Sequence, residues 1–275
     1  MDRHEMGALI AQRLAAEAER MAGEFQTRAR IGSTMIDNLL PEQLTRDIYN
    51  RFPGTDRMML RRSIKEHKRV AAQMDSYDPL LEEAVYAFQQ PEVVRLITEI
   101  TGLEALEPDC GLYAGGISLM TKDGYLRPHL DNSHDAKRQR YRVLNLLFYV
   151  TPGWREEFGG SLQLWDHGPL TRPRSFPSLF NRLVLMVTNK GSWHSVNDIV
   201  HDGRRCCVSN YYFSPVSPEA HDYFHATSFR GEHAGLEDLA MQADNALRTT
   251  VLKTLPGVYK NPHAYHRPAP AMSDA

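Results

Sequence analysis

The chain has 275 residues, of which 42% are hydrophobic and 24% are charged, and this composition excludes a disordered chain, a collagen-like fibre and a coiled coil. Its 32 Lys and Arg residues against 34 Asp and Glu residues give a formal net charge of −2, so no basic excess indicates a nucleic-acid partner. Three cysteines, two of them adjacent, do not make a disulfide framework. Since no signal peptide or membrane span is evident either, we expect a cytoplasmic protein.

The N-terminal part of the chain, to about residue 105, is predicted to be helical. Apolar residues recur there at helical spacing, and Pro41 stands where the first turn of a helix tolerates proline. The predicted helices cover residues 2–29, 42–52, 81–88 and 92–100. Residues 35–40 form a short apolar segment, and the charge-rich stretch 60–69 is expected to be the solvated face of a helix.

The pattern changes after residue 105, where short apolar runs are broken by Gly, Pro, Asn and Asp. Regularly spaced runs of this kind are typical of a β-sandwich or barrel. The predicted strands cover residues 116–120, 142–150, 160–165, 182–187 and 206–213. An apolar stripe over residues 236–251 then predicts a C-terminal helix, and the proline-containing tail from residue 256 is expected to be irregular.

No linker-like stretch separates these parts, so we expect one domain over residues 1–275. It would consist of the helical part (1–105), a β core of about residues 106–215, and a C-terminal helix and tail of about residues 216–275.

His129 and Asp131 are the strongest candidates for chemistry. Residues two apart on a strand project from the same face, so one imidazole and one carboxylate can meet a single metal ion. His194, on a later strand signal, would complete the two-histidine, one-carboxylate triad typical of non-haem Fe(II) oxygenases. The alternative is that His129 and Asp131 are loop residues and His194 is a hydrogen-bonded core histidine.

Three further features favour the metal site. Arg205 follows His194 by eleven residues and opens a strand, where a guanidinium can bind a carboxylate bidentately. The segment Lys122–Pro128 precedes the first histidine, and Glu157–Trp165 lies between the two histidines.

These motifs, in this order, resemble the Fe(II)/2-oxoglutarate-dependent oxygenases, in the branch similar to prolyl 4-hydroxylases. The pattern is Gly-x-x-x-Pro-His-x-Asp, Gly-Gly-x-Leu, His-x-Val and Gly-x-Arg, and the resemblance covers about residues 36–213. It implies a mainly β core with flanking helices, namely a double-stranded β-helix (jelly roll) preceded by N-terminal helices. It also implies that His129, Asp131 and His194 bind iron and that Arg205 binds the distal carboxylate of 2-oxoglutarate.

The sequence departs from the family pattern at two positions. Met120 stands where many members have a Tyr that contacts the co-substrate, and the spacing from His194 to Gly203 is one residue longer than in collagen-type members. Arg204 is therefore the alternative to Arg205. In family members that halogenate, a small residue stands in place of this aspartate. The presence of Asp131 therefore favours hydroxylation.

Several other residues carry weaker signals. Tyr113 and Asn145 are candidates to line the pocket and contact 2-oxoglutarate, with core polar residues as the alternative. By strand periodicity, Asn145 is expected to share one face with Val143, Leu147 and Tyr149.

Trp154 is either a structural loop aromatic or a substrate contact, and His221 with His225 has the spacing of a helical zinc pair. Adjacent Cys206 and Cys207 are expected to pack on a strand, with redox sensing as the alternative. The basic run 135–142 is either a solvated loop or a recognition element for an anionic substrate.

The leading hypothesis is an Fe(II)/2-oxoglutarate-dependent dioxygenase that hydroxylates an unactivated C–H bond of a small molecule, such as an amino acid or a biosynthetic intermediate, and releases succinate and CO2. The cofactors implied are Fe(II), 2-oxoglutarate as co-substrate and O2, with ascorbate as an accessory reductant. One alternative is a prolyl or other residue hydroxylase acting on a peptide or protein, disfavoured because no peptide-binding domain accompanies the core. Others are a non-catalytic jelly-roll binding module and a β-barrel metalloenzyme that does not use 2-oxoglutarate.

Overall fold

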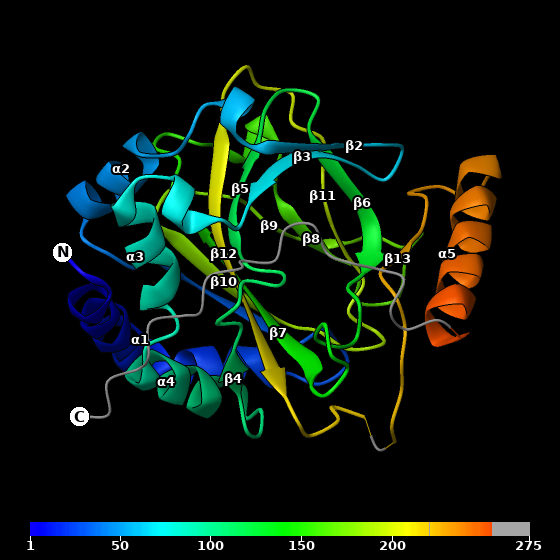
Figure 1. Ribbon diagram of the computed structural model, residues 1–275, viewed down its shortest axis with the longest axis horizontal. Coiled ribbons are helices and arrows are strands. Elements are labelled where there is room, and N and C mark those ends of the chain that lie inside the picture. Colours follow the sequence, from blue (N-terminus) through cyan, green and yellow to red (C-terminus); the bar gives the residue numbers. More distant parts are fainter. Residues whose placement is uncertain (220, 255–275) are drawn as a thin grey trace.

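The computed structural model describes residues 1–219 and 221–254 of the chain. In this part, a curled antiparallel sheet is covered on one side by a group of helices, and one long helix lies apart at the opposite edge (Figure 1). The prediction of a mainly β jelly-roll core with flanking helices is confirmed. The irregular tail expected from residue 256 lies outside the described residues.

The strands join into one sheet whose order is β1-β10-β7-β12-β5-β3-β6-β11-β8-β9, with β2 paired to β3, β4 to β12 and β13 to β6. The strands are β1 (Ser33–Asp37), β2 (Met59–Arg62), β3 (Glu66–Ala71), β4 (Glu107–Pro108), β5 (Gly116–Met120), β6 (Tyr125–Leu130), β7 (Tyr141–Tyr149), β8 (Leu162–Leu164), β9 (Arg174–Phe176), β10 (Arg182–Val187), β11 (His194–Val196), β12 (Arg205–Ser214) and β13 (Ser228–Phe229). Four of the five predicted strands match closely, as β5, β7, β10 and β12, whereas the strand expected at 160–165 is shortened to β8.

The helices of the N-terminal part pack on the outer face of the sheet, at the left of Figure 1. They are α1 (Arg3–Phe25), α2 (Glu42–Asn50), α3 (Pro79–Ala87) and α4 (Pro91–Thr101), and short 3-10 turns lie at Thr55–Arg57, Met74–Ser76 and Glu156–Phe158. Asp2 caps α1 by accepting hydrogen bonds from the backbone of His4 and Glu5, and the Glu5 side chain accepts one from Asp2 in return. This capping box satisfies backbone donors at the start of the helix.

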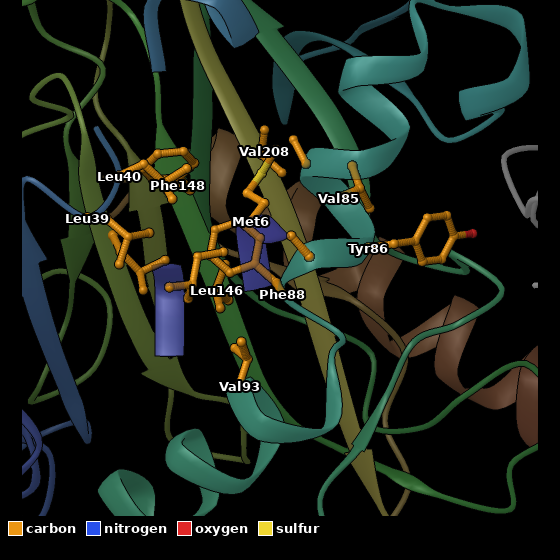
Figure 2. Close-up of a cluster of buried hydrophobic side chains, with 14 of the residues drawn as sticks. Met6, Leu39, Leu40, Val85, Tyr86, Phe88, Val93, Leu146, Phe148 and Val208 are labelled. Carbon is orange, nitrogen blue, oxygen red and sulfur yellow. The ribbon is translucent and has the colours of Figure 1, made fainter. Parts of the chain in front are cut away.

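Side-chain alternation gives the sheet two apolar faces. Leu146 and Phe148 of β7 and Val208 of β12 face the helices, where they meet Met6 and Phe88 (Figure 2). The alternate residues of the same strands point into the curl of the sheet and form a second cluster, which includes Tyr149, Val184 and Cys207. The polar residues of the candidate site also lie on this inner side.

The stretch 60–69 is a β-hairpin, and the prediction of a solvated helix face was wrong. β3 pairs with β5 through Arg69–Ala71 and with β6 through Glu66 and His67, so β3 lies between these two strands in the sheet. Hydrogen bonds from two neighbouring strands outweigh the weak helical preference of a charged segment. As a result, alternate residues of β3 line the interior of the sheet.

A bulge changes the side-chain pattern of β7. Phe213 of β12 pairs with Arg142, but Tyr212 pairs with Leu144, so Val143 is an additional residue in β7. The expectation that Val143 shares a face with Asn145 was therefore wrong, because Val143 packs in the helix-side cluster. The bulge instead turns the buried Arg142 toward the interior.

The C-terminal segment adds a short strand and a helix beside β6. β13 pairs with the end of β6, and α5 (Leu236–Thr254) packs on β13 (Figure 1). The Asn245 side chain accepts a hydrogen bond from the backbone N–H of Phe229 and donates one to the carbonyl oxygen of the same residue. Asp238 accepts hydrogen bonds from Arg230 and from the backbone of Gly231. No helix in the described ranges is both long and apolar enough to cross a membrane.

Candidate active site

Two strand ends, the end of β6 and the start of β11, bring His129, Asp131 and His194 together. His129 and His194 are direct partners across β6 and β11, with ring centroids 4.0 Å apart. Asp131 follows β6 directly, and its carboxylate oxygens lie 3.8 Å from His129 Nε2 and 3.7 Å from His194 Nε2. One ligand atom from each residue lies within 4.8 Å of the others, and the site is buried to partly buried.

Backbone carbonyl groups orient both imidazoles. His129 Nδ1 lies 3.0 Å from the Arg127 carbonyl oxygen, and His194 Nδ1 lies 2.9 Å from that of Ser192. Because a carbonyl oxygen only accepts, each Nδ1 carries the proton and each Nε2 keeps its lone pair. Both Nε2 atoms point toward Asp131, which is the arrangement that a metal ion requires.

The protonation states also suit a divalent cation. Burial is the main reason that the pKa of His129 and of His194 is lowered, so both imidazoles are neutral at neutral pH. Burial would raise the pKa of Asp131, but its neighbours, above all the positively charged Arg142, outweigh this effect and lower that pKa to about 2. The triad therefore presents two neutral nitrogen ligands and one carboxylate.

The donor set fits Fe(II). Asp131 Oδ2 is buried and has no hydrogen-bond partner among the described residues, and an orphaned carboxylate oxygen is costly unless a cation binds it. Two histidines and one carboxylate on one side of an ion leave further coordination positions open.

Arg142 is a site residue that the sequence did not identify. Its Nη1 lies 3.4 Å from Asp131 Oδ1, and its guanidinium carbon lies 4.5 Å from the centre of the Tyr211 ring. In the sequence, Arg142 is one of several arginines in the run 135–142. Neither the bulge that turns Arg142 inward nor its pairing with Asp131 has a local signal.

Arg205 and Arg204 lie on opposite sides of the sheet. Arg205 is buried, donates from Nε to Ser178 Oγ at 2.9 Å, and places its guanidinium carbon 4.7 Å from the centre of the Tyr149 ring. Arg204 instead lies over Tyr49 of α2, at 5.3 Å. Only Arg205 therefore has the interior position that the resemblance assigns to the arginine that binds the co-substrate.

The Gly159–Gly160 pair shapes the space beside Arg205. Both residues have positive φ, at +77° and +74°. A Cβ atom on Gly159 would lie 2.0 Å from the Asp198 carbonyl oxygen, and one on Gly160 would lie 2.7 Å from Arg205 Cδ. Glycine is required here for both backbone conformation and close approach.

Tyr113 and Asn145, the other predicted co-substrate contacts, differ in position. Tyr113 lines the cavity above the triad. Asn145 lies behind Tyr211, to whose hydroxyl oxygen its Nδ2 atom donates at 3.4 Å, and its Oδ1 atom is buried without a hydrogen-bond partner in the described structure. Met120 faces Arg205, whose Nη1 atom lies 3.6 Å from the Met120 sulfur.

The cavity above the triad has a volume of about 300 Å³. His129 and Asp131 contribute to its floor, and Phe229 of β13 stacks on the His129 ring with centroids 5.2 Å apart. The lining also includes residues of β3, of the loop before β5 and of the run 135–142.

The structure does not bring the remaining candidates into this site. His221 and His225 are not on a helix, and no metal-binding cluster in the described ranges includes them. Trp154 donates from Nε1 to the Gly159 carbonyl oxygen at 2.9 Å, which is a structural contact. Cys206 and Cys207 are buried on β12, and burial raises the pKa of both thiols, to about 12 for Cys206. Packing is thus favoured over redox sensing.

Comparisons with known proteins agree with this geometry. Residues 115–213, which include the triad and Arg205, match the sequence model of the 2OG-Fe(II) oxygenase superfamily. A mouse protein, prolyl 3-hydroxylase OGFOD1, is 26% identical over 106 residues, which are 36% of this chain and 19% of the mouse protein. The match thus spans about a fifth of that relative.

Two solved structures share the fold. A Pseudomonas putida prolyl-4-hydroxylase aligns with a TM-score of 0.52 at 16% identity and covers 70% of this chain and 98% of its own. The non-heme alpha ketoglutarate dependent epimerase SnoN from nogalamycin biosynthesis aligns with a TM-score of 0.51 at 14% identity. The alignment covers 94% of this chain and 97% of the epimerase chain. The matched motif region makes residues 115–213 similar to the 2OG-Fe(II) oxygenase superfamily, whose members use Fe(II), 2-oxoglutarate and O2, and the common fold and the His–Asp–His triad agree with this similarity.

Proposed function

We propose that this protein hydroxylates an unactivated C–H bond of a small molecule, with Fe(II) held by His129, Asp131 and His194. The observation that carries the proposal is the buried triad, with both Nε2 atoms directed at a carboxylate that has an unpartnered oxygen. When bound, Fe(II) with 2-oxoglutarate supplies the O2 chemistry that inserts one oxygen atom into the substrate and releases succinate and CO2.

The residues of the chain have separate tasks in this reaction. Arg205, buried and fixed by Ser178, is suited to bind the distal carboxylate of 2-oxoglutarate. Arg142 holds Asp131 ionised and in position. Phe229 and β13 cover one side of His129, which limits the access of water to the site.

The size of the cavity supports a small molecule as the substrate. A volume of about 300 Å³ lies at the lower end of the range for small-molecule sites. Hydroxylation of a prolyl or other residue in a peptide or protein is the second candidate, and the similarity to the mouse prolyl 3-hydroxylase favours it.

We also propose that the chain is one domain and that it works in the cytoplasm. Its three free cysteines support the cytoplasmic location.

The experiment that tests the function is an anaerobic titration of the full chain with Fe(II) and 2-oxoglutarate, followed by O2 and an assay for succinate. We expect a weak visible absorption band from the chelate and slow succinate release without substrate. Absence of both in folded, metal-loaded protein would contradict the proposal and favour another metal chemistry or a binding module.

A further inference from the structure

Cationic side chains surround the cavity above the triad. Its lining contains six cationic residues from separate parts of the chain: Arg61, Lys65, Lys68, Arg138, Arg142 and Arg248. Among the residues that the structure describes, three carboxylates line it, Glu66, Asp131 and Asp135, and Asp131 belongs to the triad. A cavity with walls of one predominant charge concentrates ligands of the opposite charge.

The hairpin of β2 and β3 supplies an arrangement that favours an anion. Arg61 and Lys68 are direct cross-strand partners whose side chains line the cavity. Like charges directly opposite each other destabilise a strand pair. Glu66 lies between them, 3.9 Å from Arg61 Nη1 and 3.1 Å from Lys68 Nζ, so one carboxylate faces two cations.

Lys68 also lines the same cavity as two members of the triad, His129 and Asp131. An anion held by Lys68 would therefore share this cavity with the triad.

A second group of cations lies elsewhere in the lining. The guanidinium carbon of Arg138 lies 4.1 Å from the centre of the Phe224 ring, and Arg142 pairs with Asp131. Lys65 and Arg248 both pair with Asp244 of α5, so this group, like Arg61 and Lys68 with Glu66, combines two positive charges with one carboxylate.

These cations are distinct from the group proposed to bind the co-substrate. Arg205 is not part of the cavity lining, and its guanidinium contacts Ser178, Met120 and Tyr149 inside the sheet. The Arg61–Lys68 pair is thus not needed to bind 2-oxoglutarate.

We propose that the substrate is an anionic small molecule whose phosphate, sulfate or carboxylate group is bound by Arg61 and Lys68. This inference rests on the proposed function for its chemical outcome, but anion binding is measurable without turnover. The cavity volume of about 300 Å³ leaves room for a compact molecule that extends from this anionic group to the triad.

The hairpin offers a matched pair of double variants. Arg61→Met with Lys68→Met removes two cations that face the cavity. Arg62→Met with Arg69→Met removes two from the same strands, and neither of these residues lines the cavity. The overall charge change is therefore the same in both. Lys68→Gln is the milder variant if the first double variant does not fold.

The test is calorimetric titration of sulfate, at ionic strength matched with chloride, into the anaerobic chain loaded with Fe(II) and 2-oxoglutarate. We expect the cavity-facing double variant to lose about tenfold or more in sulfate affinity, because it loses hydrogen bonds between charged groups in a partly buried site. The affinity of the control should change less than about twofold, because charges on the surface contribute little to binding. Equal losses in both variants, or no sulfate binding by the unsubstituted chain, would overturn the proposal.

Succinate release separates this inference from the proposed function. The dependence of uncoupled succinate release on 2-oxoglutarate should be the same in the cavity-facing double variant as in the control double variant. A raised requirement for 2-oxoglutarate would instead assign the pair to the co-substrate and overturn the inference. If the unsubstituted chain binds no iron and releases no succinate, the proposed function is contradicted. The sulfate titration is then repeated on the metal-free chain, where the same difference between the two double variants would still support anion binding.

Matched compounds then identify the anionic group. A sugar phosphate is compared with its parent sugar, and N-acetylaspartate with N-acetylasparagine, as stimulants of succinate release. We expect the anionic member of at least one pair to stimulate more, and the advantage to vanish in the cavity-facing variant. Stimulation only by an acidic peptide would overturn the assignment to a small molecule.

Discussion

Arg142 Nη1 lies 3.4 Å from Asp131 Oδ1, and both side chains are largely withdrawn from solvent. The bulge in β7 creates this relationship, because without it Arg142 would face the helices. The arginine compensates the buried charge of the carboxylate while Oδ2 remains without a hydrogen-bond partner in the described part of the chain.

Replacement of Arg142 by Leu is expected to weaken metal binding about 10- to 100-fold, as is typical when a residue that supports a metal ligand is removed. The metal-free chain should also lose about 3–5 kcal/mol in its free energy of unfolding, since the Asp131 charge remains buried without its partner. Co(II) titration and urea unfolding measure the two effects. Arg140→Leu is the control, because Arg140 is more exposed and pairs with Glu107 and Asp135; equal effects would contradict the role given to Arg142.

His129→Ala is expected to abolish stoichiometric Fe(II) binding and succinate release, because two ligands do not hold the ion in an open site. His67→Ala on the neighbouring β3 is the control, since its Nδ1 lies against the Asp123 carbonyl oxygen, outside the triad. Metal analysis after dialysis gives the stoichiometry. Full activity of the His129 variant would remove this histidine from the ligand set.

Arg205→Ala is expected to raise the KM for 2-oxoglutarate by about tenfold or more, since a charge-assisted bond to a carboxylate is lost. Arg204→Ala should change the KM less than about twofold, because Arg204 packs on Tyr49 outside the sheet. Uncoupled succinate release at varied 2-oxoglutarate gives both values. The reverse ranking would show that Arg204 binds the co-substrate.

Gly160→Ala tests whether close packing positions Arg205. The new Cβ atom would lie 2.7 Å from Arg205 Cδ, so the arginine must move and the KM for 2-oxoglutarate should rise while iron affinity stays constant. Gly168→Ala is the matched control, because Gly168 also has positive φ, at +86°, but its Cβ atom would meet nothing within 4 Å. Both variants should lose about 1 kcal/mol of stability from backbone strain, and an equal KM in both would contradict the packing argument.

Asp238 should make the attachment of α5 sensitive to acid. Hydrogen bonds from Arg230 lower the pKa of Asp238 to about 2, from a usual value of 3.8. A carboxyl group whose pKa is lowered on folding stabilises the folded state fully above its unfolded pKa, and the contribution is lost as pH falls through the folded value.

Hydrogen exchange in α5 should therefore accelerate as pH falls from 3.8 toward 2, after correction for intrinsic rates. Asp238→Asn should show faster exchange already at neutral pH. Glu237→Gln, at an exposed position in the same helical turn, is the control. Unchanged protection in the Asp238 variant would mean that other contacts hold the helix.

The strands and the triad could be predicted because their signals are local. Apolar runs of strand length located β5, β7, β10 and β12, and the i, i+2 spacing of His129 and Asp131 set both side chains on one face. The order of the motifs along the chain then indicated that His194 would join them.

The cationic lining of the cavity and the support of Asp131 depend on contacts between distant segments. Lys68 faces the cavity only because β3 pairs with β5 and β6, and a charged stretch carries no local signal for such pairing. Arg142 faces Asp131 only because β7 has one more residue than β12 at the bulge, and a shift of one residue exchanges the two faces of a strand. The residue types and spacing within each segment thus specify the candidate metal ligands, whereas the register between segments specifies which charges surround them.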